Sequence, residues 1–187
     1  MPSDKYLKQV TLGEVKILND KINLQEYNPD WADMFEEERK RILNIINMKN
    51  VLIEHVGSTS VPNLCAKPIL DILLGVQNSA DESSYIPALE SIGYTLKIRE
   101  PDWYEHRMLK GFNPEVNLHV FSLDCEELQK MIQFRDWLIH NKDDRERYAN
   151  VKRMLAKKTW KYLQNYADAK STIVGEILEH IKEQNNK

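Results

Sequence analysis

The sequence contains only two cysteines, Cys65 and Cys125, and they form no Cys-x-x-Cys pair. A disulfide framework and a zinc knuckle are therefore not indicated, and reduced thiols are expected. Long apolar runs are also missing: residues 1–15 are charged, and no stretch approaches the roughly 20 apolar residues that span a bilayer. We therefore expect a cytoplasmic protein that does not enter a membrane.

An excess of charge of one sign is absent as well. The chain has 26 Lys and Arg residues against 29 Asp and Glu, which gives a formal net charge of −3 at pH 7. Proteins that bind nucleic acid over a broad surface usually carry a basic excess, so general nucleic-acid binding is not expected. Any anion site must be formed locally. The 187 residues, with 42% hydrophobic content, suit one core with a helical appendage.

The main functional signal lies in residues 51–76. The β-branched segment 51–56 predicts a strand that ends at Gly57, and the hydroxyl run Ser58, Thr59 and Ser60 then opens a short helix. Backbone N–H groups are free at a helix start, the helix dipole favours negative charge, and hydroxyls add donors. The segment therefore predicts a phosphate-binding turn. The same residues would also serve simply to turn the chain and cap a helix.

Asp71 interrupts the next apolar segment, residues 68–76, which predicts a central strand covered on both faces. An unpaired carboxylate in a low-dielectric interior costs several kcal/mol, so Asp71 needs a cation, a metal ion or hydrogen-bond donors. Metal-assisted phosphoryl chemistry uses such a group. The structural alternative is a carboxylate paired with Lys67 or with a backbone turn.

The remaining pattern predicts a mixture of strands and helices. Loose alternation over residues 10–25 indicates an edge strand or hairpin, and Asn28-Pro29 marks the start of a helix over 29–47. Asp124 and Glu127 form a candidate capping box. The other expected elements are a helix from 79–81 through 92 that ends at Gly93, strands over 94–99, 103–110 and 115–122, and helices over 124–140, 143–165 and 168–184.

Each of the last three predicted helices carries a cation in its apolar stripe: Arg135, Lys152 and Lys170. Three inward cations on consecutive helices suggest a shared buried anion, which near Gly57-Ser58 would be the outer phosphates of a nucleotide. The alternative is that the aliphatic stems cover apolar surface while the charged ends reach solvent. Arg107 and Lys110 are weaker candidates for the same anion.

Several sequence blocks resemble the GrpB-like family. They are residues 27–31 (YNPDW), 53–62 (IEHVGSTSVP), 66–73 (AKPILDIL), 118–120 (LHV), 134–138 (FRDWL) and 169–170 (AK). The resemblance covers about residues 27–178. It implies an α/β (α+β) nucleotidyltransferase-like fold, with a mixed β-sheet, flanking helices and a C-terminal helical segment. On this basis we expect an N-terminal extension over 1–26, an α/β core over 27–123 and the helical segment over 124–187.

The resemblance also implies a metal site, with two departures. Enzymes of the nucleotidyltransferase superfamily carry a second acid two positions after the first, and Leu73 stands there. The family also tends to show a histidine where this chain has Asn117. The resemblance thus leaves Asp71, His119 and Glu54 as candidate catalytic residues, and Asp71, His119 and His55 as candidate ligands of Mg²⁺ or Mn²⁺. Glu54 and His55 alternate faces, so at most one faces Asp71. His119 would equally suit a buried, satisfied position.

Three hypotheses follow. The first is a metal-dependent nucleotidyltransferase or phosphoryl transferase acting on a nucleotide or other small phosphorylated substrate. The second is a catalytically inactive module that kept the phosphate site, and the third is a structural protein whose apolar helices serve oligomerisation. The residues expected to contact phosphate are Gly57, Ser58, Thr59, Ser60, Lys67, Arg135, Lys152 and Lys170.

Overall fold

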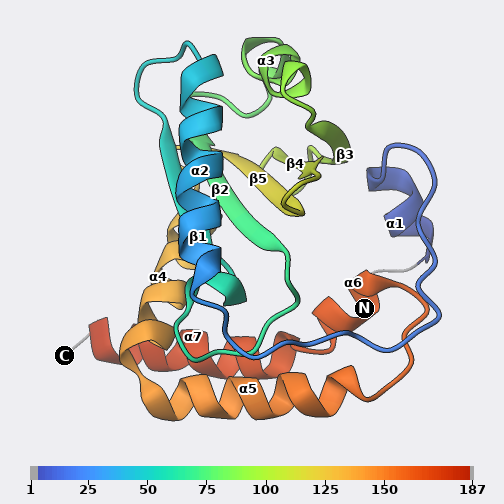
Figure 1. The fold of residues 1–187 in the computed structure, drawn as a ribbon, viewed down its shortest axis with the longest axis vertical. Helices are drawn as coiled ribbons and strands as arrows, with labels where there is room; N and C mark the ends of the chain where they lie inside the picture. The colour runs from blue at the N-terminus through green and yellow to red at the C-terminus, as the bar shows by residue number, and fades with distance from the viewer. Residues whose placement is uncertain (1–3, 186–187) are drawn as a thin grey trace.

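The computed structural model describes residues 4–185, which form a five-stranded sheet with helices around it (Figure 1). The strands are β1 (Leu52–Val56), β2 (Leu70–Val76), β3 (Thr95–Glu100), β4 (His106–Gly111) and β5 (Val116–Ser122). Their order in the sheet is β1-β2-β5-β4-β3, in which β2 and β5 are parallel and the other pairs are antiparallel. The predicted α+β class with a mixed sheet and flanking helices is confirmed.

The helices occupy both faces of the sheet and one of its ends. They are α1 (Asp4–Val10), α2 (Asp30–Ile45), α3 (Ile86–Ser91), α4 (Glu126–His140), α5 (Lys142–Ala156), α6 (Leu163–Asp168) and α7 (Ser171–Asn185). Helices α2 and α3 share the main apolar core with one face, and α4 contacts β1 and β5. Figure 1 shows α5 and α7 side by side beyond one end of the sheet. No helix within residues 4–185 is long and apolar enough to cross a membrane.

The loop between β1 and β2 joins the sheet to the C-terminal helices. The 3-10 helix η1 (Ser58–Ser60) follows β1, and the apolar residues after it, Val61, Leu64 and Cys65, pack against residues of α4, α5 and α7. Burial of these side chains fixes the loop, because each fully buried aliphatic group contributes roughly 1.5–3 kcal/mol. The position of the turn at Gly57 therefore depends on the helical segment.

The expected edge strand over residues 10–25 is not formed. Helix α1 ends at Val10, and the segment after it makes only isolated bridges, Thr11 to Ile98, Asp20 to Trp160 and Gln25 to Ala66. These bridges reach three different parts of the molecule, so the segment follows no single sheet edge. The loose alternation was too weak to specify a strand register.

The helix expected over 143–165 is interrupted. Helix α5 ends at Ala156, and the next helix, α6, begins at Leu163. The indole of Trp160 donates to the Leu155 carbonyl and its backbone N–H donates to Asp20, so tertiary hydrogen bonds end the helix where the sequence period continues.

Two smaller expectations about helix starts were wrong. The capping box at Asp124 does not occur, since Cys125 precedes α4 without a side-chain cap. The helix expected from 79–81 is a 3-10 turn, η2 (Glu82–Ser84), followed by α3. Gly93, with φ of 92°, ends α3 as predicted.

Candidate functional site

Gly57 and Asp71 lie in direct contact. Gly57 has φ of 68° and ψ of −169°, a region open essentially only to glycine. The β1–β2 register pairs Val56 with Asp71, which brings the following residue beside the carboxylate. A Cβ atom on Gly57 would lie 2.4 Å from Asp71 Oδ2 and 2.8 Å from its Cβ. The absence of a side chain at Gly57 is therefore what allows the turn and the carboxylate to meet.

The three hydroxyls of the turn have different surroundings. Thr59 is buried, with its Oγ1 3.0 Å from His55 Nε2, and Ser60 Oγ donates to the Gly57 carbonyl at 2.6 Å. These two groups hold the turn itself. Burial raises the pKa of Tyr148 on α5, and a hydrogen bond with Ser58 partly opposes that rise. Ser58 therefore connects the turn to α5.

Asp71 is held by groups from the neighbouring strand β5. Asn117 Nδ2 donates to Asp71 Oδ1 at 2.7 Å, and His119 Nε2 is 3.8 Å from the same oxygen. Burial raises the pKa of Asp71, but His119, Asn117 and Lys67 outweigh it and hold the pKa at about 2. The carboxylate is thus ionised at neutral pH. Its side chain is 32% exposed, so it remains open to solvent.

Glu54 and His55 lie on opposite faces of the sheet, as the alternation predicts. His55 stacks on Phe35 of α2, with ring centroids 4.8 Å apart, and burial lowers its pKa to about 4. Glu54 pairs with Leu73 in the ladder, and directly opposed residues share a face, so Glu54 is on the Asp71 side. The structure does not bring His55 together with Asp71 and His119.

Glu54 is bound to Arg135 of α4 rather than to the turn. Arg135 Nη1 donates to Glu54 Oε2 at 2.6 Å and to the His55 carbonyl at 2.9 Å, while its Nε donates to Asp136 at 2.8 Å. The guanidinium is only 15% exposed. Arg135 therefore joins α4 to β1, and its Nη1 and Nε donate to groups of the protein.

Replacing Arg135 with alanine is expected to lower the free energy of unfolding by about 1–3 kcal/mol, because Glu54 loses its cation and the His55 carbonyl loses a donor. Urea denaturation measures the change. Arg39→Ala is the matched control, since that arginine is exposed and 3.6 Å from Glu36, and surface pairs contribute roughly 0–1 kcal/mol. Equal decreases in the free energy of unfolding of the two variants would contradict a structural role for Arg135.

The residues around Asp71 do not fit a two-metal site. Leu73, at the position of the expected second acid, is fully buried beneath α4 in an apolar cluster with Val56, Phe121 and Leu128. Between residues 4 and 185 there is no group of three or more His, Cys, Asp or Glu side chains placed to hold a metal ion. Asp71 lies against the turn while Glu54 is paired with Arg135, and a single carboxylate binds a hard cation weakly.

Four lysines lie within reach of the charge of Asp71. Lys67 precedes β2, Lys110 lies on β4, Lys152 on α5, and Lys170 between α6 and α7. The charge of Asp71 acts on the pKa of each of them. Lys170 lowers the pKa values of Lys67 and Lys152 by like-charge repulsion, so these amines are close enough to repel one another. Of the three helix cations predicted to converge, Lys152 and Lys170 are neighbours and Arg135 is bound elsewhere.

Lys152 is the most buried of these lysines, with 2% of its surface exposed. Its Nζ donates to the Cys65 carbonyl and lies 5.3 Å from the centroid of the Tyr148 ring. Burial first, and Lys170 second, lower the pKa of Lys152 to about 7. Burial also lowers the pKa of Lys67 to about 8, although Asp71 opposes the change. The four amines thus share the field of Asp71, while Glu115 also acts on the pKa values of Lys67 and Lys110, and Asp168 on that of Lys170.

Two roles lie outside the sequence predictions. Asn117 is the donor to Asp71 and not only a replaced histidine, and Tyr148 is connected with Ser58. Strand alternation is a signal for the first, because Asn117 and His119 are two residues apart and share a face. The second depends on how α5 packs against the turn, which no local pattern encodes.

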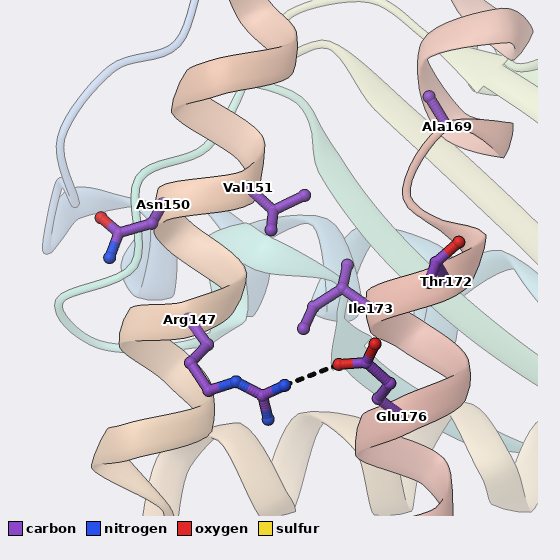
Figure 2. A pocket seen from close by; sticks show the side chains of 7 residues that line it. All are labelled: Arg147, Asn150, Val151, Ala169, Thr172, Ile173 and Glu176. Atoms are coloured by element: carbon purple, nitrogen blue, oxygen red, sulfur yellow. Dashed lines mark hydrogen bonds and ion pairs between the residues drawn. The ribbon is translucent and has the colours of Figure 1, made fainter.

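A separate groove lies between α5 and α7, away from the Gly57 turn. Figure 2 shows Arg147 directed at Glu176 across this groove, with the two side chains 2.6 Å apart. The other lining residues are Asn150, Val151, Ala169, Thr172 and Ile173. Because its two charges pair with each other, this groove offers no excess charge to a phosphate.

The chain is similar to proteins from several bacteria. The model of the family described as GrpB protein matches residues 21–180. A UPF0157 protein of Halalkalibacterium halodurans is 55% identical over 95% of this chain and 91% of its own length, and one of Streptomyces coelicolor is 39% identical over 82% and 80%. The crystal structure of the conserved protein GrpB from Enterococcus faecalis matches with a TM-score of 0.76 at 30% identity, over 88% of this chain and 100% of that one. The chain therefore belongs to the GrpB protein family.

Proposed function

We propose that this protein binds a nucleotide or another phosphorylated small molecule, with the phosphates held beside the Gly57-Ser58 turn. The observation that carries the proposal is a group of four lysines, Lys67, Lys110, Lys152 and Lys170, on whose pKa values the charge of Asp71 acts. Lys152 is buried and is repelled by Lys170 and Lys67, and a phosphate dianion would relieve both its desolvation and this repulsion. This chemistry favours phosphate over a neutral ligand.

Buried polar atoms near the lysines support the same ligand. The Nζ of Lys170 lies 4.8 Å from the centroid of the Tyr166 ring, and the Tyr166 hydroxyl is buried without a hydrogen-bond partner in the described part of the chain. Buried donors are normally satisfied, so an oxygen of a ligand or a water molecule is expected there. Ser58 and the amines would supply further donors to the same anion.

A second candidate function is metal-dependent nucleotidyl or phosphoryl transfer. The observation that favours it is an ionised, partly exposed Asp71 in contact with the turn. The two-metal form of that reaction needs a second carboxylate, and buried Leu73 stands at its position. Glu54, on the same face of the sheet, is paired with Arg135 and does not replace it. The nucleotide-binding module that lacks this chemistry is therefore the better supported of the two alternatives.

Thermal shift and calorimetry with pyrophosphate, ATP and inorganic phosphate test the two candidates, with and without Mg²⁺. For binding alone, the Asp71→Asn variant is expected to hold pyrophosphate without metal at least as tightly as the native protein, because a negative charge has been removed. For metal-dependent transfer, Asp71→Asn would abolish Mg²⁺-dependent release of pyrophosphate or phosphate. No melting-temperature increase in the native protein with any of these anions at millimolar concentration would overturn both candidates.

A further inference from the structure

A chain of hydrogen-bonded side chains runs from the far edge of the sheet to His119, which lies beside Asp71. The Tyr6 hydroxyl of α1 donates to Glu100 Oε1 at 2.5 Å, and Glu100 Oε2 is 2.7 Å from His106 Nδ1. His106 Nε2 is 3.1 Å from His119 Nδ1, and His119 Nε2 is 3.8 Å from Asp71 Oδ1. Glu100 and His106 are thus linked to the phosphate site through His119.

Packing holds these rings in place. His106 is 4% exposed and lies nearly parallel to the rings of Phe121 and His119, with ring centroids 4.7 Å and 5.3 Å away, while Trp103 packs edge-on at 5.2 Å. The register that pairs Met108 with His119 places His106 one step further along the same face. The two imidazoles therefore have few alternative orientations.

The direction of donation along the chain follows from its two ends. Glu100 accepts a donor on each oxygen, which favours the carboxylate form, so His106 Nδ1 carries the hydrogen. Burial lowers the pKa of His106 to about 4, so the ring is neutral at pH 7. A neutral ring that carries its hydrogen on Nδ1 has no hydrogen on Nε2. His106 Nε2 then accepts, and His119 Nδ1 must be the donor.

We propose that Glu100 and His106 are positioning residues that fix the neutral form of His119 as the Nδ1–H tautomer, so that in this form its Nε2 lone pair faces the phosphate site beside Asp71. Two acceptors 3.8 Å apart repel each other unless a donor lies between them. The donor that fits is a hydroxyl, from water or from an alcohol group of the bound compound. The identity of the ligand rests on the proposed function, and the inference narrows that ligand to a phosphorylated compound with a hydroxyl group. The tautomer of His119, by contrast, is a property of the protein without ligand.

Long-range ¹H–¹⁵N NMR of the imidazole rings at pH 8 tests which tautomer the neutral form of His119 adopts in the ligand-free protein. The native protein is expected to show His119 protonated on Nδ1 and bare on Nε2. In His106→Phe the acceptor is lost, and His119 is expected to change to the Nε2–H form and donate to Asp71. His106→Gln restores an acceptor oxygen near the Nε2 position and is expected to return the native tautomer. His180→Phe, which alters a remote histidine, should change nothing at His119.

The outcomes separate this inference from the proposed function. An Nε2–H tautomer of His119 in the native protein, or an unchanged His119 spectrum in His106→Phe, would overturn it. If His106→Phe does not fold, Glu100→Ala removes the other constraint, and an unchanged native tautomer in that variant would equally overturn it. Pyrophosphate has no alcohol group, so its affinity should not change in His106→Phe. Absence of pyrophosphate binding in the native protein would count against the lysine site and leave the tautomer result standing.

Discussion

Replacing Gly57 with alanine is expected to lower the free energy of unfolding by about 2–6 kcal/mol and to abolish phosphate binding. The backbone of Gly57 lies in a region that costs other residues roughly 1–3 kcal/mol. The new Cβ would also stand 2.4 Å from Asp71 Oδ2 and 2.8 Å from Asp71 Cβ, and overpacking of this kind costs typically 1–3 kcal/mol. The variant must move either the turn or the carboxylate, and each movement changes the site.

Gly93→Ala is the matched control for this substitution. Gly93 also has a positive φ, 92°, but a Cβ there would meet nothing within 4 Å. The free energy of unfolding of Gly93→Ala, measured by urea denaturation, should therefore fall by the backbone contribution alone, on the order of 1 kcal/mol. The pyrophosphate affinity of this variant should be unaffected. Equal destabilisation of the two variants would contradict the close contact between Gly57 and Asp71, and so would native pyrophosphate affinity in Gly57→Ala.

The Gly57–Asp71 pair was predictable because its signals are local. A glycine that ends a β-branched segment indicates a turn, and an acid in an apolar strand indicates an uncommon environment. The partners of Arg135 were not predictable in the same way. Its helical stripe shows that the guanidinium points inward, but Glu54 is 81 residues away in sequence, and only the packing of α4 on β1 brings the two together.

Tertiary contacts also explain the elements that the sequence pattern misplaced. Continuous helical periodicity favoured one helix over 143–165, yet hydrogen bonds from Trp160 to Leu155 and Asp20 end α5 earlier. The role of His106 was not predictable from the sequence, because a histidine near a turn has no distinctive local pattern. Its role depends on contacts with Glu100 and His119, which the register of β3, β4 and β5 brings beside it.

Lys152→Met is expected to make the ligand-free protein more stable while reducing pyrophosphate affinity at least tenfold. Lys152 is 2% exposed, and burial and the nearby Lys170 lower its pKa to about 7. Methionine fills a similar volume without a charge, so the desolvation and repulsion disappear. The lost hydrogen bond to the Cys65 carbonyl offsets part of the gain. From a pKa shift of this size we expect the free energy of unfolding of Lys152→Met to exceed that of the native protein by about 2–4 kcal/mol at pH 6.5.

The stability difference between Lys152→Met and the native protein should depend on pH, which a change in packing alone would not produce. Lys152 has a lower pKa folded than unfolded, so the unfolded chain binds more protons between about pH 7 and the ordinary lysine pKa near 10.4. The contribution of Lys152 to the native protein's stability should therefore rise with pH over that window and stay constant below it. Urea denaturation at pH 6.5 and 9.5 should show the advantage of Lys152→Met shrinking at the higher pH.

Lys142→Met, at the exposed start of the same helix, is the control and should alter neither stability nor affinity appreciably. Anion binding should also raise the pKa of Lys152, so calorimetry of the native protein at pH 8 in buffers of different ionisation enthalpy should report proton uptake with pyrophosphate, and Lys152→Met should report less. A variant that is less stable at every pH, or that binds pyrophosphate as the native protein does, would contradict the proposal. A buried amine that destabilises the empty protein and is needed by the filled one is the energetic signature expected of a binding group.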